Sequence, residues 1–361
     1  MNTFYFVIAL FLIIYCLLSV YVGYNGWVWI KKTFPYRNKM IYVVCIVFLS
    51  MNLFIERFFS SKILAFLSGM WMVIIGYSII LLPIVNLLYF ILKKRGARVL
   101  GGAVIAFFIF VFAYGSYLAW NPVVRTYEMT VNKASNIDKL NILMVSDLHI
   151  GKMIGATHIG KLLDITKERK PDIVMIPGDI IDDNIETFMA ENVGDVIAQI
   201  KAPLGIFATS GNHDYYGGDL ERLFTEMEKA GVTMLADKAV EIEESFYIVG
   251  RNDDTDDQRK NIADVVKRLD EKKPVIMMDH QPTEIIEASE NGVDVLLSGH
   301  THRGQVAPAN LITKWLYEND YGYLKINNLH SIVSSGYGFW GPPFRIGSQS
   351  EVVEIIIRFE E

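Results

Sequence analysis

The chain has 361 residues, 52% of them hydrophobic, and this is more apolar than a soluble chain of that length usually is, so a membrane portion is expected. Ten of the 34 Lys and Arg residues but only one of the 40 Asp and Glu residues precede residue 121, which leaves 24 basic and 39 acidic residues, a formal net charge of −15, for the remainder. An acidic domain of this kind argues against a nucleic-acid ligand, and the lack of cysteine after residue 121 excludes zinc–thiolate sites there.

Four long apolar runs occupy residues 1–120. They cover roughly residues 4–30, 40–55, 63–92 and 99–120, and each approaches or exceeds the ~20 residues that a helix needs to cross a bilayer. The sequence therefore predicts a transmembrane anchor of about four helices over residues 1–120, with the lipid bilayer as its partner.

Basic residues in the loops indicate the orientation of this anchor, because Lys and Arg near the ends of spans favour the cytoplasmic side. Eight of them lie in the first and third loops: Lys31, Lys32, Arg37, Lys39, Lys93, Lys94, Arg95 and Arg98. With four spans, we expect a multi-pass cell-membrane protein whose remaining residues lie on the extracytoplasmic face. If the run at 40–55 does not span, those residues lie in the cytoplasm instead.

Residues 121–139 are expected to form a polar linker, and residues 140–361 an α/β domain. Short runs rich in Val, Ile and Leu alternate there with amphipathic segments, the pattern of strands covered by helices. The expected strands are 140–147, 172–179, 204–211, 245–250, 274–280 and 293–300, with further strands in 330–360, and the expected helices are 158–169, 185–200, 218–230 and 258–271.

Polar side chains follow five of these strands. The first strand ends at Asp147 and His149, the second at Asp179, the third at Asn212, His213 and Asp214, a later one at His280, and the last at His300 and His302. Five of the seven histidines of the chain lie at these ends. Because the carboxyl ends of neighbouring strands meet at one edge of an α/β sheet, we expect these side chains to gather in one crevice.

Carboxylate, imidazole and amide ligands in such a crevice suit a pair of divalent ions about 3.5–4 Å apart, a site that hydrolyses phosphate esters. Nitrogen and oxygen ligands without thiolate favour manganese, with iron or zinc as alternatives.

The ordered motifs "DLH", "GD", "GNHD", a lone His and "GHTH" resemble those of the calcineurin-like metallophosphoesterases, in particular a bacterial membrane-linked branch. The resemblance covers about residues 140–358 and implies a two-sheet β-sandwich flanked by helices. It implies that Asp147, His149, Asp179 and His302 bind a first metal ion, and that Asp179 bridges to a second ion held by Asn212, His280 and His300. It further implies that His213 protonates the leaving oxygen and that Asp214 orients His213.

Several other residues have two interpretations. Arg303 and Arg345 either bind the substrate phosphate or form surface salt bridges. Asp182 and Asp183 are expected to cap or solvate a turn, and His158 and His330 to be surface or capping residues. The aromatic segment 311–325 is expected to form a packed β-hairpin, with a lip toward lipid headgroups as the alternative.

The expected function is that of a membrane-anchored, binuclear metal-dependent phosphoesterase that cleaves a phosphate ester or pyrophosphate, with a phospholipid or another lipid-linked envelope compound as substrate. Two alternatives remain. One is a cytoplasmic-facing nucleotide–lipid pyrophosphatase of the UDP-diacylglucosamine type, and the other is a non-catalytic receptor for a phosphorylated ligand.

Overall fold

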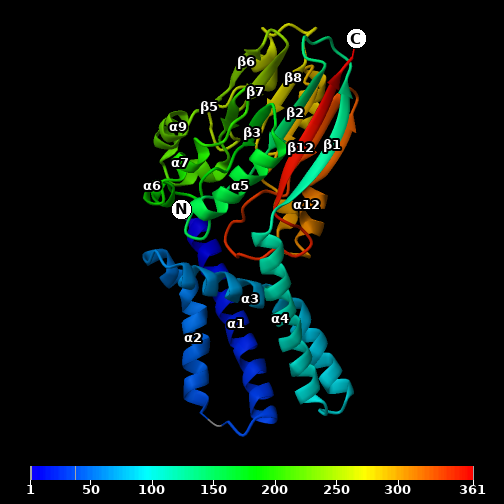
Figure 1. The fold of residues 1–361 in the computed structure, drawn as a ribbon. Helices are drawn as coiled ribbons and strands as arrows, with labels where there is room; N and C mark the ends of the chain where they lie inside the picture. Colours follow the sequence, from blue (N-terminus) through cyan, green and yellow to red (C-terminus); the bar gives the residue numbers. More distant parts are fainter. Residues whose placement is uncertain (1, 37, 361) are drawn as a thin grey trace. The chain divides into compact units, whose positions relative to one another are not determined.

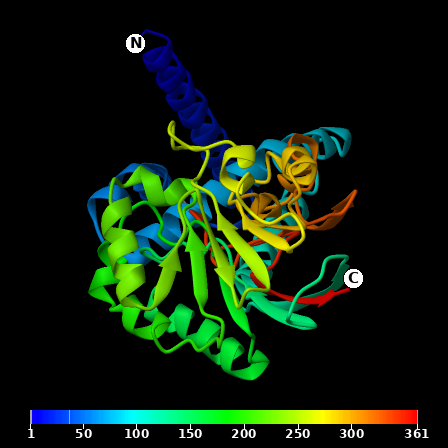
Figure 2. The same ribbon diagram turned by 90° about the horizontal axis from the view of Figure 1, so that it is seen from above.

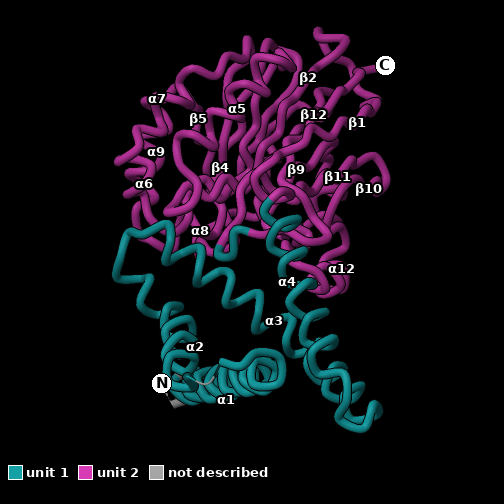
Figure 3. The backbone as a smooth tube through the Cα atoms, turned by 60° about the horizontal axis from the view of Figure 1, so that its bottom comes forward, with its two compact units in different colours: residues 1–116, 341–343 teal, residues 117–340, 344–361 magenta. Residues whose placement is uncertain are grey.

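The computed structural model describes residues 2–36 and 38–360. Within them the chain forms two compact units, drawn in different colours in Figure 3. The first unit contains the residues up to Ser116 together with Gly341–Pro343, and the second contains Tyr117–Trp340 and the residues from Phe344 onward.

The first unit is built from helices α1 Asn2–Thr33, α2 Lys39–Ile55, α3 Lys62–Ile91 and most of α4 Ala97–Trp120, with a short 3-10 helix η1 Glu56–Phe58 after α2. The last four residues of α4 belong to the second unit. All four α-helices are long and apolar enough to cross a membrane, including α2, which η1 extends to 20 residues. Side chains cap two of them, since Asn38 accepts from the backbone of Ile41 and Ser61 from that of Leu64. The expected four-helix region is therefore confirmed.

The second unit contains two six-stranded sheets (Figures 1 and 2). The first sheet has the order β1-β12-β2-β3-β4-β5, and the second the order β10-β11-β9-β8-β7-β6. The strands of the first sheet are β1 Val123–Val131, β12 Glu351–Phe359, β2 Lys139–Met144, β3 Ile173–Pro177, β4 Ile206–Thr209 and β5 Val232–Met234. Those of the second are β10 Gly322–Ile326, β11 Leu329–Val333, β9 Val295–Ser298, β8 Val275–Met278, β7 Phe246–Gly250 and β6 Lys238–Ile242.

The hydrophobic core is layered because successive side chains of a strand point to opposite faces. In β2, Leu140, Ile142 and Met144 pack between the two sheets, whereas Leu143 packs against the helices on the outer face. Both faces are thus covered, which explains why the strands appear in the sequence as continuous apolar runs rather than as alternating patterns. The expected two-sheet fold flanked by helices is confirmed.

Helices cover the outer faces of both sheets. The outer core of the first sheet is shared with α5 Ala156–Arg169, α6 Glu186–Ala190, α7 Val193–Ile197 and α9 Leu220–Lys229, and that of the second with α10 Ile262–Val266 and α11 Ile285–Glu290. Three short helices lie in loops: α8 Asn212–Tyr216, η2 His302–Gly304 and α12 Asn310–Leu316.

Three differences from the expected elements concern the segments 121–139, 185–200 and 258–271. The segment 121–139, expected as a linker, contains β1, which pairs in parallel with β12 and buries Met129 and Val131 in the core between the sheets. The expected helix 185–200 is two short helices because Asn192 between them has a left-handed backbone with φ 49°. Of the expected helix 258–271, only α10 is formed.

Candidate metal centre

The polar residues at the strand ends do converge. The loops after β2, β3 and β4 of the first sheet and after β8 and β9 of the second carry them. Among the described residues, four groups of three side chains have ligand atoms close enough to hold a metal ion, and two overlapping groups consist only of the expected ligands. Ligand atoms of Asp147, His149 and His302 lie within 4.8 Å of one another, and so do those of Asp147, Asp179 and His280.

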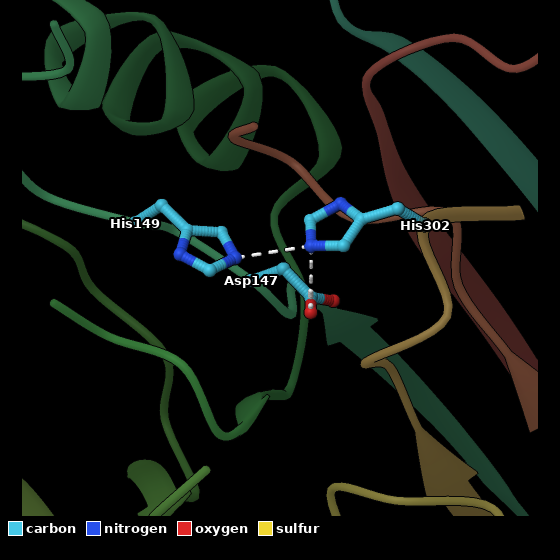
Figure 4. Close-up of side chains that lie close together, drawn as sticks. All are labelled: Asp147, His149 and His302. Carbon is cyan, nitrogen blue, oxygen red and sulfur yellow. Dashed lines mark hydrogen bonds and ion pairs between the residues drawn. The ribbon is translucent and has the colours of Figure 1, made fainter. Parts of the chain in front are cut away.

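The first group is shown in Figure 4, where the three side chains point toward one another. Nε2 of His302 lies 3.0 Å from Nε2 of His149 and 3.5 Å from Oδ1 of Asp147. All three residues are buried. Two imidazoles and a carboxylate facing one point are a donor set for a divalent cation.

The second group lies around Asp179. Its Oδ2 is 3.2 Å from Nε2 of His280 and 3.6 Å from Nε2 of His149, so this carboxylate faces both groups. Nδ1 of His300 lies 2.9 Å from Oδ1 of Asn212, and the rings of His280 and His300 are 5.3 Å apart. All seven residues expected as ligands are therefore brought into one site.

The protonation of His280 fits a metal ligand. Its Nδ1 lies 2.9 Å from the carbonyl oxygen of Pro177, which can only accept, so Nδ1 carries the hydrogen and Nε2 is left to face Asp179. Nε2 of His280 and Oδ2 of Asp147 are buried and make no hydrogen bond within the described residues. Buried polar atoms without a partner are costly, and a cation would satisfy both.

Electrostatics favours ligand protonation states at Asp179, His300 and His302. At His280, burial lowers the pKa, but the neighbouring Asp179 outweighs burial and raises the pKa well above its usual value, so this imidazole must lose a proton when it binds a cation. Burial alone would raise the pKa of Asp179, but the neighbouring His280 and His149 lower the pKa below its usual value. Burial, together with the charge that His280 can carry, lowers the pKa of His300 to about 4. Burial, His149 and Arg345 lower the pKa of His302 well below the usual value. An ionised carboxylate and neutral imidazoles are the forms that bind metal ions. The residues present therefore fit the divalent ions that the sequence implies.

The backbone at the site is unusual. Asp147, His149, Asp179, His300 and His302 have φ values of 55°, 45°, 51°, 69° and 48°. Positive φ is uncommon outside glycine and costs on the order of 1–3 kcal/mol per residue, so the surrounding fold must impose it. The left-handed backbone after β2, β3 and β9 directs these polar side chains toward the candidate metal centre.

Two glycines leave room for these side chains. Gly178 has φ 84°, and a Cβ there would lie 2.5 Å from Nδ1 of His280. A Cβ at Gly299 would lie 2.3 Å from Oδ2 of Asp147. Any larger residue at either position would displace a ligand.

His213 lies beside the first group, and its ring centroid is 4.8 Å from that of His149. Its Nδ1 is 2.7 Å from Oδ1 of Asp183 and 3.6 Å from Oδ1 of Asp182. Burial lowers the pKa of His213, but the bond to Asp183 and the nearby Asp179 outweigh burial and raise it. The two acidic residues expected only to cap or solvate a turn therefore contact this histidine.

Asp214, which was expected to orient His213, does not contact its ring. One oxygen of Asp214 accepts from the backbone N–H groups of Ile180 and Ile181 at 2.9 and 3.0 Å, and the other accepts from Gly211 at 2.8 Å. Asp214 therefore joins the loop that carries Asp179 to the loop that carries His213. The sequence "GDIIDD" placed acidic residues close to Asp179, but only the folded loop shows that Asp183 reaches His213.

The two arginines occupy different environments. Arg303 is half-buried, and its guanidinium lies 4.4 Å above the ring of Tyr321. Arg345 is fully buried, and its Nη2 lies 3.1 Å from Nδ1 of His302 and 3.2 Å from the carbonyl oxygen of Gly336. Arg345 thus joins His302 to the loop that contains Gly336, in a buried position that is not accessible to a substrate and does not allow a surface salt bridge.

A loop within the second unit connects the centre to the end of α4. Gly338 donates its backbone N–H to the carbonyl oxygen of Asp147 at 2.7 Å, and Tyr337 donates to that of Ser146 at 2.9 Å. The next residue, Phe339, packs edge-to-face on Trp120, the last residue of α4, with ring centroids 5.0 Å apart. A single loop therefore contacts both Trp120, the last residue of α4, and the expected ligand Asp147.

Comparison with known proteins adds to this geometry. Residues 140–304 match the calcineurin-like phosphoesterase family. A metallophosphoesterase of Aquifex aeolicus is 32% identical over 243 residues, which are 65% of this chain and 91% of that protein. A metallophosphoesterase of Helicobacter pylori is 31% identical over 60% of this chain and 59% of its own length. A Danio rerio transmembrane protein with a metallophosphoesterase domain is 28% identical over 66% of this chain and 57% of its own. The chain thus spans nearly all of the first relative and somewhat more than half of the other two.

Proposed function

The chain belongs to the calcineurin-like phosphoesterases, which are metal-dependent hydrolases, and on that premise we propose that it is a membrane-anchored enzyme with two divalent ions that cleaves a phosphate ester or pyrophosphate of a lipid-linked envelope compound.

In this proposal Asp147, His149, Asp179 and His302 hold one ion, and Asp179 is shared with a second ion held by Asn212, His280 and His300. Divalent ions bound there, with manganese the first choice and iron or zinc as alternatives, would act as Lewis acids that lower the pKa of water and polarise the phosphoryl group. The position of Asp179 Oδ2, 3.6 Å from His149 and 3.2 Å from His280, supports its shared role.

His213 is the proton donor in this proposal. As the oxygen of water bonds to phosphorus, the bond from phosphorus to the leaving oxygen breaks, and that oxygen needs a proton. Asp183 binds Nδ1 of His213, which leaves Nε2 to carry the proton that is transferred. Asp183 therefore takes the positioning role first assigned to Asp214.

The main support for a lipid-linked substrate is the short series of contacts between the end of α4 and the candidate metal centre. Trp120 ends the fourth helix and packs on Phe339, and the neighbouring Gly338 bonds to Asp147. A substrate held in the bilayer by its lipid tails would present its phosphate near the end of α4, and the loop that contacts Trp120 also contacts Asp147. Phospholipids and other lipid-linked phosphates share that arrangement.

The test is a comparison of substrates. Purified full-length protein in manganese is offered phosphate esters on lipids, in vesicles, and the same esters on water-soluble carriers. We expect a higher kcat/KM for the lipid-linked esters. Equal or faster cleavage of soluble nucleotides would contradict the lipid substrate, although the phosphoesterase assignment would stand.

The side of the membrane is a separate part of the proposal. The eight basic residues of the first and third loops support a position of the second unit outside the cytoplasm if all four helices span. A chain with Cys16 and Cys45 replaced by Ala and Asn132 replaced by Cys should then react with an impermeant maleimide on intact cells. Reaction only after lysis would indicate the cytoplasmic face and would favour a nucleotide–lipid pyrophosphatase.

A further inference from the structure

Helix α12 exposes an apolar surface on the second unit. Leu311, Ile312, Trp315 and Leu316 are 65%, 59%, 82% and 59% exposed, and we call these four residues the α12 face. Isolated exposed apolar side chains are common, but four of seven residues in one helix, including a nearly fully exposed tryptophan, form a contiguous patch.

The polarity of α12 is inverted relative to a helix on a water-soluble domain. Such a helix packs its apolar side on the core and turns its polar side to water. In α12 the hydroxyl of Thr313 binds inward to Oδ2 of Asp320 at 2.8 Å, whereas the α12 face points away from the domain and no residue of the helix is buried. The expectation of a packed β-hairpin for 311–325 is therefore wrong for the α12 residues, and only β10 belongs to a hairpin.

The helix is linked through Asp320 to the loop that carries His300 and His302. The hydroxyl of Thr301, between His300 and His302, donates to the carbonyl oxygen of Asp320 at 2.6 Å. Tyr317, at the end of α12, has its ring centroid 6.0 Å from that of His300. A contact made by the α12 face therefore fixes the position of the candidate ligands relative to whatever it touches.

We propose that the α12 face inserts into the headgroup region of the bilayer that holds α1 to α4. Tryptophan next to lysine is typical of that region, and Lys314 lies within α12, in a unit that otherwise carries an excess of acidic residues. The second unit also contains the last residues of α4, from Tyr117 onward. The last turn of α4 pairs with Ser350, which donates its N–H to the carbonyl oxygen of Leu118 at 3.1 Å and its hydroxyl to that of Ala119 at 2.6 Å.

This docking holds whether or not the substrate is a lipid, and its consequence for turnover rests on the proposed function. The inserted α12 face would set the height of the candidate ligands above the bilayer, so that a phosphate at headgroup depth meets them. The face does not contact the substrate itself.

The experiment measures insertion without using activity. In the full-length chain with Cys16 and Cys45 replaced by Ala, Ile312→Cys is labelled with an environment-sensitive fluorophore, and the protein is placed in nanodiscs whose lipids carry a quencher near the headgroup. The matched control is Glu168→Cys on α5, whose side chain is 74% exposed. We expect blue-shifted emission and loss of most of the fluorescence at position 312, with neither effect at position 168.

Equal behaviour of the two probes would overturn the proposal. A blue shift at 312 without quenching by lipid would also overturn it, because a second copy of the chain or another protein would then cover the face. A second measurement uses the double variant Ile312→Glu and Trp315→Glu, for which the ratio of lipid-linked to soluble turnover should fall about tenfold, the equivalent of about 1.4 kcal/mol of lost docking. If neither the wild type nor the double variant cleaves either ester but the quenching at position 312 persists, the proposed phosphoesterase function is wrong and the proposed membrane docking stands.

Discussion

Left-handed backbone is concentrated among the proposed ligands, five of which have a positive φ. Each such residue opposes folding locally, and the strands and loops around it must compensate. Asp214 is part of that support, since it accepts three backbone N–H groups from the two loops that carry Asp179 and His213. The residues next to a reactive group can thus be as specific in position as the group itself.

The contact between Asp183 and His213 leads to a first prediction. Replacement of His213 by Ala should lower kcat by about 10²–10⁴-fold while metal content is retained, because the general acid is lost and the ligands are not. Asp183→Asn should lower kcat in the same direction by a smaller factor, because an amide no longer stabilises the charged imidazole. Enzyme assays with elemental analysis of each purified variant check this. Loss of metal from His213→Ala would show that His213 is a ligand instead.

His158 leads to a prediction on pH. It is buried against Trp120 and Tyr337 rather than at the surface as expected, and burial lowers its pKa to about 4 from an ordinary value near 6.5. The unfolded chain therefore binds more protons between these values, and the free energy of unfolding should fall by up to about 3 kcal/mol as the pH drops from 6.5 to 4, with no loss above 6.5.

The check compares the wild type with His158→Phe, which cannot be protonated. The midpoint of thermal unfolding in detergent should decrease more steeply for the wild type than for the variant across that window. Parallel curves would show that another group is responsible for the acid sensitivity.

Strand β1 is the element that sequence patterns identified least well. Arg125, Thr126 and Glu128 are exposed, and together they make the segment resemble a polar linker. The strand is nonetheless paired along its full length with β12, and the side chain of Arg125 binds Glu351 at 2.7 Å. An edge strand buries only part of one face, so its sequence carries a weaker apolar signal than the strands at the centre of a sheet.

This assignment can be tested by two substitutions in the same strand. Met129→Ala should lower the free energy of unfolding by about 2–5 kcal/mol, because Met129 fills the core between the sheets. Glu128→Ala, one residue away on the exposed side, should change it by less than about 0.5 kcal/mol. Similar, small effects of both, measured by denaturant unfolding, would mean that residues 123–131 do not belong to the domain in solution.

For the molecule as a whole, the excess of carboxylates in the second unit and the burial of the candidate ligands make bound cations a source of stability. Ions that bind only the folded chain should raise the free energy of unfolding by about 2.7 kcal/mol at 100 times the dissociation constant. Treatment with a chelator should therefore lower the midpoint of thermal unfolding, and manganese should restore it.

Asp179→Asn is the matched control for the metal effect, because it removes the carboxylate that faces both groups. Its thermal unfolding should respond little to chelator or manganese. An equally large response in this variant would place the stabilising ions elsewhere in the chain.

Much of this molecule followed from local patterns in the sequence. The four apolar helices could be predicted because bilayer thickness sets their length, and most strands of the second unit because burial on both faces leaves continuous apolar runs. The order of the strand ends also predicted which polar residues would gather, since parallel strands bring their carboxyl ends to one edge of a sheet. These properties depend on neighbours in the chain or on a general rule of topology.

Only the tertiary structure decided the rest. That Asp183 rather than Asp214 binds His213, that Arg345 is buried behind His302, and that α12 turns its apolar side outward all depend on contacts between distant segments. Side-chain type and spacing do not determine such contacts, because a change of one left-handed residue redirects a loop and gives each side chain a different partner.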